Sequence, residues 1–121
     1  MFNIEFFTKA SGKSPVEDYI NDQHSKVRNK IYRTIQLLKQ HGFALPGKHL
    51  KRMAGAPNLW ELRVKHGSIN YRIFLAKVGN NIIILLHIIT KKRQKTSSQD
   101  IDTALDRLKS YKQLQEGNIR Q

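Results

Sequence analysis

The chain has 121 residues, no cysteine and a formal net charge of +13 at pH 7. The lack of cysteine excludes disulfide bonds and thiolate metal sites, and the length predicts one domain over residues 1–121. So large a positive charge favours a polyanionic partner, with nucleic acid ahead of anionic membrane. The sequence has no apolar run of transmembrane length and no signal peptide at its start, so we expect a cytoplasmic protein without a membrane partner.

The N-terminal third predicts a short strand followed by two antiparallel helices. The strand covers Asn3–Thr8. After a loop, Ser14 is a good N-cap residue with proline directly after it, which predicts a helix over about Pro15–Asn21. A second helix is predicted from about Ser25 to His41, because apolar residues recur there at helical spacing and Gly42 follows as a stop signal.

Residues 43–58 are predicted to form an irregular connection, because they contain two prolines and two glycines. The middle of this segment is basic and contains Lys48, His49, Lys51 and Arg52.

The next segment predicts three consecutive strands. Leu59–Lys65 and Ile69–Lys77 alternate between apolar and polar residues, as half-buried strands do, whereas Ile82–Ile89 is apolar on both faces, as expected of a central strand. The face of the first two strands that is not fully apolar carries Glu61, Arg63, Lys65, Asn70, Arg72 and Phe74.

A last helix is predicted to begin at Ser97 or Ser98, and residues 113–121 are predicted to be a frayed polar tail. The element order is therefore β-α-α-β-β-β-α. It predicts an α+β fold with a small, twisted, mostly antiparallel sheet, two N-terminal helices and one C-terminal helix.

Basic residues are concentrated around the three strands. Residues 42–99 contain eleven lysines and arginines but only one carboxylate, Glu61, which gives this span a local net charge of +10. So uneven a distribution predicts a defined anion-binding face rather than a generally charged surface.

Three short motifs occur in this region in a specific order. They are Leu-Trp-Glu-Leu-Arg at 59–63, Tyr-Arg-Ile at 71–73, and Lys91-Lys92 followed by Gln94-Lys95-Thr96. In this order and spacing the chain resembles the HigB-like, phage-related branch of the RelE/ParE toxin superfamily. Two positions depart from that branch, because Ile88-Ile89 stands where Gly-Phe is frequent and Ser97 where proline is frequent.

The resemblance implies a RelE-like fold and a toxin of a type II toxin–antitoxin pair. Such a toxin is a metal-independent endoribonuclease, an mRNA interferase that inhibits translation by cutting mRNA in the ribosomal A site. The resemblance also implies a helix-turn-helix antitoxin, HigA-like, in a hetero-oligomer with the toxin. ParE-type relatives have the same fold but act on DNA gyrase, so the fold alone does not decide the target.

Metal-free RNA cleavage requires a base for the 2′-OH, cations for the phosphorane and an acid for the leaving 5′-oxygen. Arg63 and Arg72 are candidates to clamp the phosphate, because they lie on strands expected to be neighbours. Lys92 and Lys95 are candidate proton-transfer groups, because neighbouring cations lower the pKa of a lysine. Glu61 is a candidate base, or a structural partner of the two arginines.

Seven further residues are predicted to contact nucleic acid. They are Lys48, Lys51, Arg52, Lys65, Lys91, Arg93 and Gln94. Among the aromatic residues, Trp60 and Tyr71 are expected in the core, whereas Phe74 is a candidate for stacking on a base. The five histidines have no metal-ligand spacing, His87 is expected to be packed in its strand, and no cofactor is predicted.

Two alternatives to the nuclease remain from the sequence. One is a gyrase-directed toxin on the same fold, and the other is a basic nucleic-acid-binding module without catalysis. For the toxin, the antitoxin is expected to contact mainly the helices of residues 15–41 and to leave Arg63 and Arg72 open.

Overall fold

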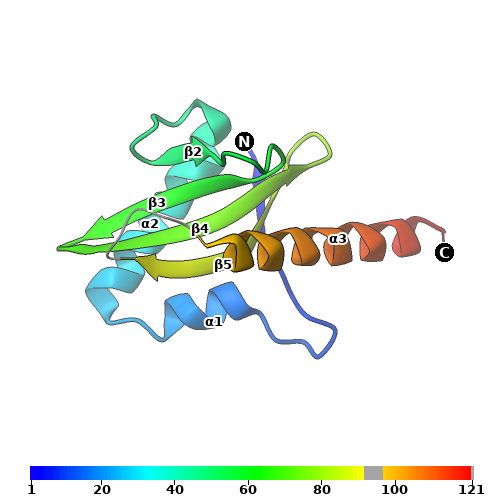
Figure 1. Ribbon diagram of the computed structural model, residues 1–121, viewed down its shortest axis with the longest axis horizontal. Coiled ribbons are helices and arrows are strands. Elements are labelled where there is room, and N and C mark those ends of the chain that lie inside the picture. The colour runs from blue at the N-terminus through cyan, green and yellow to red at the C-terminus, as the bar shows by residue number, and fades with distance from the viewer. Residues whose placement is uncertain (92–96, 121) are drawn as a thin grey trace.

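The computed structural model describes residues 1–91 and 97–120, which form a five-stranded sheet with helices on both faces (Figure 1). The elements in chain order are β1 Asn3–Phe6, α1 Pro15–Asn21, α2 Ser25–His41, the 3-10 turn η1 Gly42–Ala44, β2 Leu50–Arg52, β3 Trp60–His66, β4 Ile69–Val78, β5 Ile82–Lys91 and α3 Ser98–Arg120.

The strands are arranged in the order β1-β5-β4-β3-β2. The pair β1–β5 is parallel and the other three pairs are antiparallel. The two hairpins turn at Gly67 and Gly79, whose φ angles of 61° and 63° suit glycine better than any residue with a side chain. The predicted α+β fold with a mostly antiparallel sheet is therefore confirmed.

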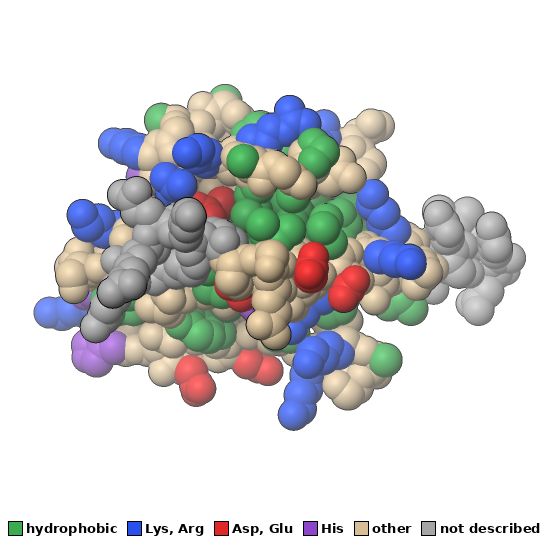
Figure 2. All heavy atoms as spheres, viewed as in Figure 1, with side chains coloured by type: hydrophobic (Ala, Val, Ile, Leu, Met, Phe, Trp, Pro, Cys, Tyr) green, Lys and Arg blue, Asp and Glu red, His purple; other side chains and the backbone are tan. Residues whose placement is uncertain are grey.

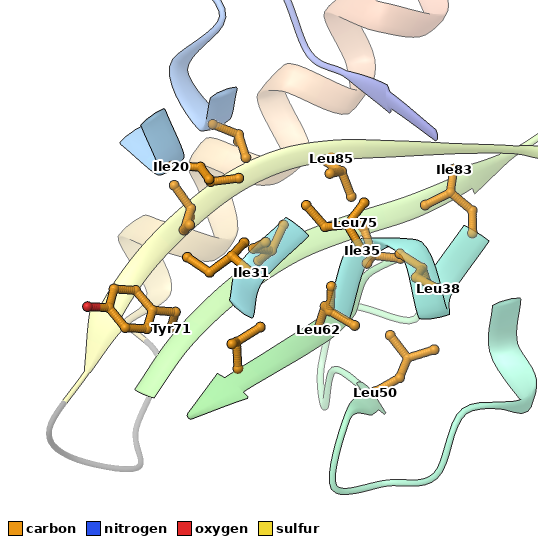
Figure 3. Close-up of a cluster of buried hydrophobic side chains, with 14 of the residues drawn as sticks. Ile20, Ile31, Ile35, Leu38, Leu50, Leu62, Tyr71, Leu75, Ile83 and Leu85 are labelled. Atoms are coloured by element: carbon orange, nitrogen blue, oxygen red, sulfur yellow. The ribbon is translucent and has the colours of Figure 1, made fainter. Parts of the chain in front are cut away.

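Helices α1 and α2 cover one face of the sheet. Ile20 of α1 and Ile31 and Leu38 of α2 are fully buried. They belong to one core cluster with Leu62 of β3 and Leu75 of β4 (Figure 3). The alternation predicted for β3 and β4 is confirmed, because Leu62, Val64, Tyr71, Ile73 and Leu75 enter this cluster whereas Phe74 belongs to the cluster on the other face.

Helix α3 covers part of the opposite face and runs along β5 (Figure 1). Ala104, Leu108 and Tyr111 pack there in a second core cluster with Phe74 and Leu86. The hydroxyl of Tyr111 also donates a hydrogen bond to the carboxylate of Glu5 in β1, and burial, followed by this carboxylate, raises the pKa of Tyr111.

The helix boundaries follow the sequence closely, although the capping interactions differ in detail. Ser14 occupies the N-cap position of α1, but its hydroxyl donates to the carbonyl of Phe7 and makes no cap hydrogen bond. At α2 the ring of His24 provides the cap by accepting from the amide of Lys26. Gly42 ends α2 with a φ of 55°, and a Cβ there would lie 2.1 Å from the ring of Phe2.

Two features differ from the expected element order. The connection of residues 43–58 contains the strand β2, which pairs with β3 and adds a fifth strand to the sheet. The last helix is helical as far as Arg120, so it includes most of the segment that was expected to fray.

Candidate active site

The face of the sheet that carries α3 also carries Glu61, Arg63 and Arg72, in cross-strand rows. Arg63 of β3 lies directly opposite Arg72 of β4. In the next row toward the β3–β4 turn, Lys65 lies opposite Asn70, which in turn lies opposite Lys91 of β5. Directly opposite residues in antiparallel strands have Cβ atoms roughly 5 Å apart, so the two arginines are neighbours, as predicted.

Glu61 connects the two arginines. Its Oε1 atom accepts a hydrogen bond from Nε of Arg63 at 2.7 Å and lies 3.7 Å from Nε of Arg72. This carboxylate therefore orients the guanidinium of Arg63 through a hydrogen bond and lies within ion-pair distance of the guanidinium of Arg72. The arrangement corresponds to the structural role that the sequence allowed for Glu61.

The two arginines differ in their access to solvent. The side chain of Arg72 is 7% exposed and that of Glu61 is 5% exposed, whereas that of Arg63 is 35% exposed. With Nε directed at Glu61, Arg63 has its terminal NH₂ groups available for a ligand, in the planar fork that suits phosphate. Arg72 contributes a buried positive charge behind it. Together the three groups carry one net positive charge, which favours an anion at this position.

The apolar side chains of α3 pack on this face against Phe74 and Leu86, farther along the sheet from the β3–β4 turn than Arg63. Phe74, the next residue of β4 on this face, is fully buried in the α3 cluster. It therefore cannot stack on a base, and that candidate is wrong. Trp60 and Tyr71 pack against or within the core on the other face, as expected.

The predicted nucleic-acid contacts are divided between the faces of the sheet. Lys51 lies opposite Glu61 and shares its face, and Lys65 lies beside Arg63 on the same face. Arg52 lies opposite Trp60 on the other face, where its Nε donates to the carbonyl of Pro57 and its guanidinium lies 5.9 Å from the indole centroid. Lys48 lines a groove beside β3.

Basic side chains gather at the left of the view in Figure 2, over the end of the sheet where β3 and β4 turn. Lys92, Arg93, Gln94 and Lys95 lie outside the described residues, and Lys91 is described only as the last residue of β5.

His87 belongs to a network that the sequence did not predict. Its Nε2 lies 2.9 Å from Oδ1 of Asp100, and its Nδ1 lies 3.3 Å from a terminal nitrogen of Arg107. Because Arg107 only donates, Nδ1 of His87 is the acceptor and Nε2–H donates to Asp100. Burial lowers the pKa of Arg107, and Ser97 donates to the other oxygen of Asp100.

This network has the residue types of a catalytic triad but not its connectivity. The hydroxyl of Ser97 bonds to Asp100 instead of to the imidazole, so His87 cannot activate it as a base. The amide of Asp100 in turn donates to Ser97, which is the arrangement of a helix cap. His87 therefore links the start of α3 to β5 through a hydrogen bond. This is a structural role, as the sequence favoured.

No metal or membrane feature appears in the part of the chain that the structure describes. Among these residues, no group of three or more histidine, aspartate or glutamate side chains is arranged to hold a metal ion. The helices in the same residues are too short or too polar to cross a membrane.

Comparison with known protein families adds one finding. Residues 18–109, well over half of the chain, match the family described as phage-derived protein Gp49-like (DUF891). The chain belongs to this family. No match was found among curated proteins.

The Gp49-like family is a RelE/HigB-like toxin family of toxin–antitoxin systems. The matched residues extend from α1 into α3 and include the whole Glu61–Arg63–Arg72 group. Family membership therefore associates this Gp49-like chain with toxin–antitoxin systems and indicates an antitoxin as its partner.

Proposed function

We propose that this protein is the toxin of a type II toxin–antitoxin pair and acts as a ribosome-dependent mRNA endoribonuclease. The observation that carries the proposal is the Glu61–Arg63–Arg72 group, which places one partly exposed and one buried guanidinium side by side on one face of the sheet. Two arginines fixed by one carboxylate suit a phosphodiester whose negative charge increases in the transition state.

The proposed reaction is an internal transfer at phosphorus. The 2′-oxygen attacks the adjacent phosphorus and forms a new P–O bond, while the P–O bond to the 5′-oxygen of the next nucleotide breaks. A base takes the 2′-OH proton, and an acid gives a proton to the leaving 5′-oxygen. Arg63 binds a non-bridging oxygen of the phosphate, and the buried charge of Arg72 stabilises the phosphorane.

The groups proposed to transfer protons are Lys92 and Lys95, and they are assigned from the sequence. Lys92 and Lys95 follow β5, whose last residue, Lys91, shares a cross-strand row with Asn70 and Lys65 next to the arginines. Glu61 is assigned a positioning role, because both arginines already lie against its Oε1 atom. The partner in this proposal is a helix-turn-helix antitoxin of the HigA-like kind.

The proposal is tested by mapping mRNA cleavage on translating ribosomes with purified toxin. Replacing Arg63 by alanine should lower the cleavage rate roughly 100- to 1,000-fold, the usual effect of removing one donor to a transition-state oxyanion. Lys77→Ala is the matched control, because it removes the same charge from the far end of β4, and it should leave the rate within about twofold.

Three results would decide against the proposal. Efficient cutting of free RNA that chelation abolishes would indicate a metal-dependent nuclease. Inhibition of gyrase supercoiling without mRNA cleavage would indicate the gyrase-directed alternative. Equal fractional losses of RNA binding and of translation inhibition in the Arg63 variant, with no cut ends, would indicate a binding module.

A further inference from the structure

A second basic site lies beside the arginines, in a groove of about 470 Å³ between α2 and the outer edge of β3. Its polar lining comes from four separate segments. These are Lys30 and Thr34 of α2, Lys48 and His49 of the loop before β2, Arg63 and Lys65 of β3, and Asn70 of β4. None of the residues that line this groove is an aspartate or a glutamate. Four permanent cations around one hollow without a carboxylate favour a ligand that carries several negative charges.

The groove follows the free edge of the sheet. In the described chain β2 pairs with β3 only from Trp60 to Leu62, and the amide of Arg63 donates at 2.7 Å to the carbonyl of His49. Backbone groups of a strand alternate in direction from one residue to the next. The amide of Lys65 therefore points to the same edge as that of Arg63, beyond the end of β2.

One wall of the groove is rigid. Thr34 is buried, and its hydroxyl donates at 2.9 Å to the carbonyl of Lys30 one turn earlier in α2. Its neighbours Ile31, Ile35 and Leu38 anchor this stretch of α2 in the core. The exposed side chain of Lys30 thus extends from a fixed backbone, which lowers the entropy lost when a ligand binds there.

We propose that this groove is a binding subsite for the phosphate backbone of single-stranded RNA. It holds nucleotides next to the phosphate that Arg63 binds. The inference rests on the proposed function, and Arg63 connects the two sites because it contacts Glu61 and also lines the groove. A basic groove that follows the backbone is the usual way in which proteins hold single strands without reading their sequence. In this proposal the RNA backbone crosses the edge of β3 and continues towards α2.

The test compares two double variants that remove the same charge from exposed lysines. Lys30→Ala with Lys48→Ala changes the groove, whereas Lys9→Ala with Lys13→Ala changes the loop before α1. Affinity of the purified toxin for a short single-stranded RNA is measured by fluorescence anisotropy at several salt concentrations. Circular dichroism checks that both variants remain folded.

The groove variant should bind roughly tenfold more weakly, and its slope of log K against log salt should fall by about 1.4, which is 0.7 for each of two phosphates. The loss should be equal for RNAs of different sequence, and the control should change less than about twofold. Equal losses in both variants, or none in the groove variant, would overturn the subsite. So would unchanged RNA affinity combined with weaker antitoxin binding, because the groove would then hold an acidic peptide.

Failure of this inference can be separated from failure of the proposed function. If the Arg63 variant loses ribosomal cleavage while the groove variant keeps its full RNA affinity, the function stands and the subsite is wrong. If the groove variant loses RNA affinity but the unmodified toxin never cuts mRNA on ribosomes, the subsite stands and the nuclease assignment is wrong.

Discussion

Glu61 is the only carboxylate between residues 42 and 99, and it lies against two arginines in a nearly solvent-free position. A buried carboxylate between two guanidiniums is held by strong charge-assisted hydrogen bonding, and its removal leaves buried positive charge without compensation. The site thus also contributes to the stability of the fold, because the carboxylate that lies against the two proposed phosphate-binding arginines also compensates their positive charge.

This gives a prediction that separates the two roles considered for Glu61. Glu61→Gln should lower the free energy of unfolding by roughly 3 kcal/mol, because it removes one partner of a buried ion pair. Urea unfolding followed by circular dichroism measures the change. Unaltered stability together with complete loss of mRNA cleavage would instead make Glu61 the general base, and the positioning role would be wrong.

The sequence predicts which residues share this site but not how each one is placed. Alternation along β3 and β4 is enough to put Glu61, Arg63 and Arg72 on one face, because strand periodicity is a local property. It does not reveal that Arg72 is 7% exposed while Arg63 is 35% exposed. That difference depends on tertiary packing, as does the burial of Phe74 beneath α3.

The elements show the same division between local and non-local information. The bounds of α1 and α2 can be predicted because proline, glycine and helical spacing are local signals. β2 cannot, since a three-residue strand has no measurable periodicity and forms only because Leu50–Arg52 pairs with β3. The contact of His87 with Asp100 joins a strand to a helix, so no local sequence pattern contains it.

The anchoring of α3 gives a prediction about this element. Asp100→Ala should lower the free energy of unfolding by about 1–2 kcal/mol, because it removes the bonds to His87 and Ser97 and a favourable charge in the first turn of the helix. Asp102→Ala is the control, since it removes the same charge from an exposed position in the same helix. Thermal unfolding of both variants measures the effect, and equal shifts would show that the network with His87 does not hold α3.

At the scale of the whole molecule, the sheet separates two surfaces. α1 and α2 cover one face, and the Glu61–Arg63–Arg72 group lies on the other, beside α3. A partner bound to the outer surface of α1 and α2 therefore has no need to touch the arginines. Under the proposed function, such a partner would inhibit by its bulk alone, because it would keep the toxin from entering the ribosome.

The last prediction follows from this separation. We expect the antitoxin to contact mainly α1 and α2, so that a toxin altered at the arginines still forms the complex. The suitable variant combines Arg63→Ala with Arg72→Lys, because the lysine keeps a positive charge beside the buried Glu61 carboxylate. It should lose toxicity yet bind antitoxin within about twofold of the unaltered affinity, measured by calorimetry. Lys26→Glu with Arg33→Glu, at exposed positions of α2, should instead weaken the complex about tenfold or more by reversing charge at the interface. If the arginine variant loses more than ~3 kcal/mol of binding free energy, the size expected for a broken buried charge pair, the antitoxin covers the active site itself.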